Sequence, residues 1–498
     1  MSSALLYQWL FLRLSPRFTL PFLLFLAAML GVAFPPVARW AVDALPPLPA
    51  ALAVLACLAA GVILSLWGAT AVYHAAPPRP AAWIHARPRT LAAAEPSAPV
   101  APPAPLGRYR RIGLILAGGG AKGAYQAGAM AAVHGFLSDR GALGSVRMVA
   151  ATSVGAWNAC FWLAGMASEE PDSPLERWWS RLRLSEVVAP TYYLPAGRNY
   201  VLSAAPWRRS FRALFRDDPT ARERLEAVLR DPERLRFYLT RTNVERAHLE
   251  FSTNRADLVD VDNASGRVRP LEPPDRWLRA RSLADLEDAV FASMDIPPLF
   301  EYVRIGDEMF EDGGVVDNLP IYFGTGIEKC DLLFVLPLNA SFAAGVDRRR
   351  ILRRMQRVLA IRQGALERKS LKDVYLYNEL AALRARAASR SAGTPHQPVD
   401  PEPAGSAPAL RDASELTLAE RAADRVHRPV QIFAVCPDEP LEIDTLEFWK
   451  TRAAGRAFRL MREHTRYELE RFDFDAEPNW IRVALVGPSG EVRYLEDF

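Results

Sequence analysis

The sequence contains few cysteines and almost no excess of charge. Its 498 residues include only four cysteines, at positions 57, 160, 330 and 436, and they follow neither a zinc-binding spacing nor a disulfide framework. We interpret them as isolated reduced thiols packed as small apolar side chains. The net charge is +4, which argues against a strongly basic nucleic-acid binder. We therefore expect no metal centre and no nucleic-acid partner.

Long apolar runs, in contrast, are present near the N-terminus. Residues 18–38 and 51–73 each provide the ~20 apolar residues that a helix needs to cross a bilayer core. The stretch between them, residues 39–50, is too short for a domain and fits a tight turn. The sequence therefore predicts a membrane hairpin over residues 1–75.

Arginines flank this hairpin unequally. Several precede the first run or follow the second, whereas the turn contains only Arg39, which lies near Asp43. Because basic residues favour the cytoplasmic side, we expect a multi-pass protein of the cytoplasmic membrane, with its large domain on the cytoplasmic side. Alternatively, the first run is a cleaved signal peptide. The second run would then stop transfer and leave the large domain in the cytoplasm.

Composition divides the rest of the chain. Residues 76–107 are rich in alanine and proline, as in an extended linker. Residues 108–475 have the pattern of one folded domain, interrupted by a low-complexity stretch at about 388–414 that we interpret as a disordered insertion. Residues 476–498 predict a C-terminal hairpin tail.

A glycine-rich loop opens the predicted domain. The apolar residues 112–117 predict a buried strand, and three glycines and a helical pattern follow them. This order indicates an α/β domain with a mostly parallel sheet flanked by helices. Gly118, Gly120 and Gly123 satisfy a dinucleotide fingerprint. The next strand, however, lacks the acidic residue that this fingerprint requires, and no Walker serine or threonine follows Lys122.

The same glycines have a second chemical interpretation. Backbone N–H groups at the start of a helix stabilise a developing negative charge when no side chain blocks the approach. We therefore predict an oxyanion hole at Gly118, Gly119 and Gly120. A tight turn without chemistry remains the alternative at this point.

A serine lies on the next strand-to-helix turn. Residues 146–151 predict a strand and an apolar helix starts near Gly155, so Ser153 lies between them. A nucleophile elbow requires small residues two positions before and after the serine, and here they are Ala151, in place of the expected glycine, and Gly155. Alone, a serine in such a turn is more often a helix N-cap.

An aspartate follows a predicted strand–turn–strand unit. Asp312 precedes Gly313 and Gly314, whose lack of side chains lets a carboxylate approach another loop. An aspartate within hydrogen-bonding reach of a serine can act as its general base, and partial desolvation strengthens that base. The alternative role is an Asx turn. We expect the next two polar residues, Asp317 and Asn318, to cap a helix.

In this order, the motifs GGGAKG, ATSVG and DGG resemble those of the patatin-like phospholipase family. Residues 240–253, 291–303 and 430–464 are similar to further segments of that family, so the resemblance extends from about Arg111 to about Arg471. It implies a serine–aspartate dyad, with Ser153 as nucleophile and Asp312 as base. The residues that support the motifs are Lys122, Gly123, Ala151, Gly155, Gly313 and Gly314.

The sequence thus predicts a membrane-anchored acyl hydrolase that cleaves fatty-acyl esters of phospholipids or lysophospholipids without a cofactor. Two alternatives stay open. One is an α/β-hydrolase-type esterase in which His427 completes a triad; the other is a non-catalytic membrane scaffold. A basic helix predicted at residues 347–369 either packs on the domain with a solvated face or attracts anionic lipid headgroups.

Overall fold

The structure is a computed structural model that describes residues 15–75, 106–191, 200–256, 259–261, 268–270, 277–297, 299–339, 351–392, 429–439, 441–476, 478 and 481–495. Most of the predicted linker at 76–107, most of the predicted insertion at 388–414, and His427 lie outside these residues.

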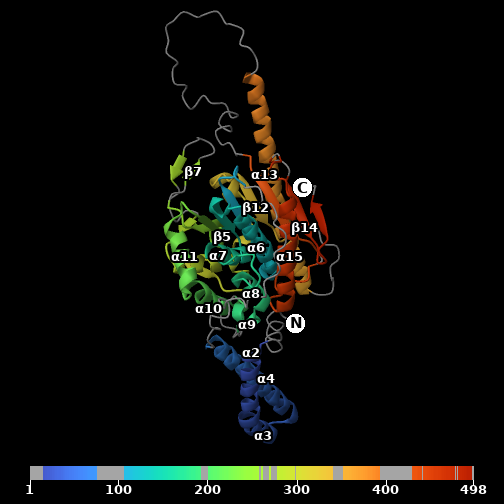
Figure 1. Ribbon diagram of the computed structural model, residues 1–498. Helices are drawn as coiled ribbons and strands as arrows, with labels where there is room; N and C mark the ends of the chain where they lie inside the picture. Colours follow the sequence, from blue (N-terminus) through green and yellow to red (C-terminus); the bar gives the residue numbers. More distant parts are fainter. Residues whose placement is uncertain are drawn as a thin grey trace, which may run out of the picture.

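The described part of the domain is built on an eleven-stranded sheet (Figure 1). Six neighbouring strands are parallel, in the order β5, β2, β1, β12, β13, β14. Antiparallel strands lie at both edges. The predicted α/β fold with a mostly parallel sheet is confirmed. The strand bounds are β1 Ile112–Leu116, β2 Val146–Ala151, β5 Arg236–Asn243, β6 His248–Thr253, β9 Trp277–Arg279, β10 Val303–Ile305, β11 Glu308–Asp312, β12 Leu332–Leu336, β13 Gln431–Pro437, β14 Arg482–Val486 and β15 Val492–Leu495.

Hydrophobic cores cover both faces of the sheet. Because successive side chains of a strand point to opposite faces, Leu114 and Leu116 of β1 join one core while Ile115 joins the other. The first core packs under helices that Figure 1 shows beside the sheet. These are α6 Gly123–Asp139, α7 Val154–Leu163, α8 Pro174–Arg181, α12 Leu283–Met294 and α15 Thr451–Arg471. The second core includes Leu371 and Val374 of α13, Ile351–Ala392.

The two N-terminal apolar runs form helices. Residues Pro16–Ala44 are one helical segment that consists of α2 (Pro16–Ala28), a π turn and α3 (Phe34–Ala44), and α4 spans Pro47–Ala75. Both segments are long and apolar enough to cross a membrane, by length and composition. They extend from one end of the domain, whereas α13 projects from the other (Figure 1).

A direct contact ties these helices to the domain. The Tyr73 hydroxyl, near the end of α4, donates a hydrogen bond of 3.1 Å to the Val188 carbonyl. Val188 lies between the short helix α9, Leu184–Val187, and the strand β3, Ala189–Pro190. The domain end that carries α9 and α10 (Ala205–Phe211) therefore lies next to the apolar helices.

The helix predicted at residues 347–369 is longer than expected. It corresponds to α13, which runs from Ile351 to Ala392 and so enters the stretch predicted to be disordered. Glu367 of α13 is completely buried and contacts the glycine loop region, so this part of the helix packs on the domain.

Candidate active site

Three loops converge at the carboxyl ends of the central parallel strands. The glycine loop follows β1 and Ser153 follows β2, and these parallel neighbours end together because Leu116 pairs with Ala151. Asp312 ends β11, which runs antiparallel to β5, and its pairing with Arg241 places it near the carboxyl end of β5, the parallel neighbour of β2. Ligands of open α/β sheets bind beyond the carboxyl ends of such strands. The predicted nucleophile, base and oxyanion loop thus occupy one place.

Ser153 occupies a strained elbow. Its φ of 55° is unusual for a residue with a side chain. Although it stands at the N-cap position of α7, its side chain makes no capping hydrogen bond, so the capping alternative does not describe it. A Cβ on Gly155 would lie 2.6 Å from the Leu116 carbonyl oxygen, which explains the glycine there. At Ala151 the turn accommodates a methyl group, and this residue is fully buried.

Asp312 is buried and faces the serine. It is 5% exposed, its Oδ1 accepts a 2.7 Å hydrogen bond from the Gly314 N–H, and the Ser153 hydroxyl lies near enough to interact with it. Burial raises the Asp312 pKa to about 7, although these two interactions oppose the rise. The Asx turn is therefore present as well, and it orients the carboxylate towards Ser153.

The glycine loop offers two N–H groups. The Gly118 N–H already donates to the Asn318 carbonyl at 3.2 Å. Within the described residues, the N–H groups of Gly119 and Gly120 have no such acceptor. A Cβ on Gly118 would lie 2.8 Å from the Ser153 Cβ, so this loop passes directly over the serine. Of the three predicted donors, Gly119 and Gly120 remain available to an oxyanion.

The geometry agrees with a family match. Residues 114–323 match the model of the family described as patatin-like phospholipase. The chain carries a patatin-like phospholipase domain. A comparison with curated proteins gives no match. A solved structure, VipD from Legionella pneumophila, is similar over 73% of this chain and 67% of that one, with 14% identity and a TM-score of 0.31, too low to support an argument. The match supports a lipid acyl hydrolase at the level of the family.

A buried polar network holds the glycine loop of the patatin-like domain. The Asn318 amide donates to the Gly118 carbonyl at 3.0 Å and to Glu367 Oε1 at 2.5 Å. Asn339 also donates to Glu367, and it accepts a hydrogen bond from Lys122. Lys122 is 2% exposed, and burial lowers its pKa. This motif lysine therefore supports the loop and does not face solvent.

Asn318 departs from the role expected for it. Its side-chain amide bridges the glycine loop and α13, and it caps no helix. Asp317 accepts only the local N–H of Leu319, at 3.1 Å. The sequence could not distinguish these roles, since Glu367 lies 49 residues further along the chain.

The end of α12 contacts both candidate catalytic residues, which the motifs did not predict. The Ser293 hydroxyl accepts a 2.8 Å hydrogen bond from the Ser153 N–H. Two residues later, the Asp295 carbonyl accepts a 2.9 Å hydrogen bond from the Asp312 N–H. The only sequence signal was the resemblance of residues 291–303 to a patatin-like segment.

Within the described residues, no cluster of histidine, cysteine, aspartate or glutamate could hold a metal ion.

Proposed function

We propose that this chain is a membrane-anchored lipid acyl hydrolase with a Ser153–Asp312 dyad. One observation carries the proposal: the Ser153 hydroxyl lies beside a buried carboxylate, that of Asp312, whose pKa is about 7. A carboxylate with this pKa is a much stronger base than a solvated aspartate, whose pKa is about 3.9. It also still ionises near neutral pH, which general-base catalysis requires.

The reaction proceeds through an acyl-enzyme. Asp312 takes the proton from the Ser153 hydroxyl as the oxygen attacks the ester carbonyl. The N–H groups of Gly119 and Gly120 stabilise the oxyanion that forms. When the tetrahedral intermediate collapses, the leaving alkoxide takes the proton from Asp312. Asp312 then deprotonates a water molecule that attacks the acyl-enzyme, and it returns this proton to Ser153 as the fatty acid leaves.

The N-terminal helices support a membrane-anchored enzyme. The Tyr73–Val188 contact holds one end of the domain next to α4, which agrees with a substrate taken from a bilayer. The arginine asymmetry favours the cytoplasmic side for the domain. Lipid esters are therefore the substrates, and the direct Ser153–Asp312 contact favours a dyad over a triad that includes His427.

Covalent labelling tests the proposal. A fluorophosphonate probe should label the full-length wild-type protein, and Ser153→Ala should abolish labelling and reduce lipid ester hydrolysis by at least about 10³-fold. Ser489→Ala, at an exposed turn, is the matched control and should retain both activities. Undiminished labelling of the Ser153→Ala protein would refute the nucleophile. A wild type that is neither labelled nor hydrolytic would instead support a scaffold.

A further inference from the structure

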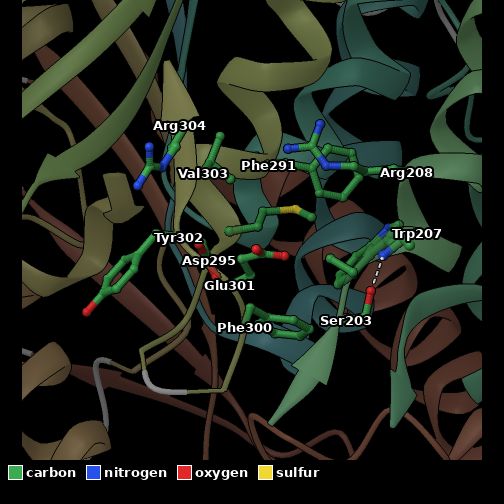
Figure 2. A pocket seen from close by; sticks show the side chains of 13 residues that line it. Ser203, Trp207, Arg208, Phe291, Asp295, Phe300, Glu301, Tyr302, Val303 and Arg304 are labelled. Carbon is green, nitrogen blue, oxygen red and sulfur yellow. Dashed lines mark hydrogen bonds between the residues drawn. The ribbon is translucent and has the colours of Figure 1, made fainter. Parts of the chain in front are cut away.

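A cavity of about 220 Å³ is lined by Asp295, the residue whose carbonyl accepts the Asp312 N–H (Figure 2). It is enclosed by α10, the C-terminal end of α12 and the segment leading into β10. Aromatic and aliphatic side chains form much of its wall, namely Trp207, Phe291, Met294, Phe300 and Val303. The Asp295 carboxyl group lies among them in Figure 2. Because α10 lines the cavity, the cavity reaches the end of the domain next to the apolar helices (Figure 1).

Asp295 is the unusual member of this wall. It is 4% exposed, and within the described residues neither carboxyl oxygen makes a hydrogen bond of ordinary length and angle. The Asp295 pKa is raised to about 9, mainly by burial and also by the nearby Glu311 and Asp312, against weaker effects of the Val303 N–H and Arg208. At neutral pH the group is thus an uncharged acid with one O–H to donate.

Hydrogen bonds join the wall of the cavity to the dyad. Asp295 accepts the Asp312 N–H through its own carbonyl, and Ser293, two residues earlier, accepts the Ser153 N–H. A group bound against the Asp295 side chain therefore lies close to an ester that reacts at Ser153. In a diacylglycerol backbone the two ester groups stand on neighbouring carbons, which suits such an arrangement.

The charges around Asp295 select among ligands. An anion there would face the carboxylates of Asp312 and Glu311, while Arg208 is already paired with Asp288 at 2.9 Å. A cation would first require Asp295 to ionise in a buried place. A neutral oxygen acceptor is not repelled by these carboxylates and does not require Asp295 to ionise. It accepts a hydrogen bond from the protonated acid. The apolar wall then accommodates hydrocarbon. Glu301, Tyr302 and Arg304 complete the polar rim of the cavity.

We propose that this cavity binds the second, non-reacting ester of a diacyl lipid, and that Asp295 donates a hydrogen bond to its carbonyl oxygen. The proposal rests on the proposed function and deepens it, since it makes diacyl lipids the preferred substrates. Asp295 is then a specificity-determining residue. A lipid whose second chain is attached through an ether lacks the carbonyl oxygen and loses this contact.

The test compares lipids that differ only in this carbonyl. Full-length protein is assayed in mixed micelles with a diacyl phospholipid and with both positional isomers of the matching acyl–alkyl ether lipid. The wild type should favour the diacyl lipid by about tenfold in kcat/KM, the size of effect expected for one lost hydrogen bond in a buried site. Asp295→Leu should remove this preference, whereas Asp295→Asn keeps an N–H donor and should retain it to within about threefold.

Titration provides a second readout. In the wild type the diacyl preference should be lost above a pH of about 9, as Asp295 ionises. In Asp295→Asn it should stay constant across that range. A preference that is independent of pH, or equal in wild type and Asp295→Leu, would overturn the assignment. A change that instead follows headgroup charge, with anionic and zwitterionic lipids compared, would make the cavity a headgroup site and also overturn it.

Binding separates this inference from the proposed function. With Ser153→Ala as background, titration of tryptophan fluorescence with the same lipids reports binding without turnover, because Trp207 lines the cavity. Asp295→Leu should weaken diacyl binding by about tenfold and leave ether-lipid binding nearly unchanged. This result is expected even if Ser153 proves not to be the nucleophile. Equal weakening for both lipids would refute the carbonyl contact.

Discussion

Asp312 and Asp295 are both buried and are joined by a backbone hydrogen bond, but the surroundings of their carboxyl groups differ. Asp312 accepts a hydrogen bond from the Gly314 N–H and interacts with the Ser153 hydroxyl, and its pKa is about 7. Asp295 lacks comparable partners within the described residues, and its pKa is about 9. Burial is the largest cause of both shifts.

The difference shows how one region yields two kinds of acid. Hydrogen bonds donated to a carboxylate favour its ionised form. Asp312 can therefore act as a base near neutral pH, whereas Asp295 keeps its proton and can only donate it to a hydrogen bond. Pairs of titratable groups whose pKa values are pushed apart by their environments commonly divide acid and base roles between them.

The strongest way to break this comparison is to remove the basic oxygen of Asp312. Asp312→Asn nearly preserves the shape of the side chain, and hydrolysis should fall by about 10²- to 10⁴-fold because general-base assistance is lost. His427→Ala should stay within a few-fold of wild type. Rates are measured after circular dichroism confirms folding. A folded His427→Ala protein as inactive as Ser153→Ala would establish a triad in place of the dyad.

The next largest effect concerns pH. Because the Asp312 pKa is about 7, its carboxylate becomes protonated as the pH falls below that value, and kcat/KM should then drop about tenfold per pH unit. Hydrolysis at pH 5 should therefore be about 100-fold slower than at pH 8. The profile is measured with a neutral lipid ester, so that substrate ionisation contributes nothing. An acid limb near the usual aspartate value would contradict the raised pKa.

These roles could be predicted only partly from sequence. The strand at 112–116, the elbow at Ser153 and the turn at Asp312 follow from local patterns of apolar, small and glycine residues. Ser293 and Glu367 gave no comparable signal, because a hydroxyl or carboxylate in a helix is ordinarily solvated or caps a turn. Their roles arise from packing, which brings Ser293 to Ser153 across 140 residues of chain. Such long-range contacts are decided by tertiary structure and not by local propensity.

A smaller effect is expected from the positioning residue Ser293. Ser293→Ala leaves the Ser153 N–H without an acceptor, so the elbow becomes less well fixed, and kcat should fall by about tenfold with little change in KM. Ser293→Thr keeps the hydroxyl and should restore most of the rate. Steady-state kinetics separate kcat from KM. Equal losses in the alanine and threonine variants would indicate packing damage and not a lost hydrogen bond.

The last prediction concerns stability and not rate, and its sign follows from the raised pKa of Asp312. An aspartate with a folded pKa of about 7 and an unfolded value near 3.8 binds a proton more tightly in the folded state. The folded state is therefore penalised as pH rises from the unfolded pKa to the folded one, by roughly 1.4 kcal/mol per unit, and the penalty is constant above pH 7. Asp312→Asn cannot ionise and still accepts the Gly314 N–H. It should therefore be more stable than wild type at pH 8 by roughly 2–4 kcal/mol, or several degrees in Tm, and this gain should vanish near pH 4. Thermal denaturation of both proteins at the two pH values measures it. A gain in stability that is equal at pH 4 and pH 8 would mean that it does not come from removing a buried negative charge. The raised pKa of Asp312 would then be wrong.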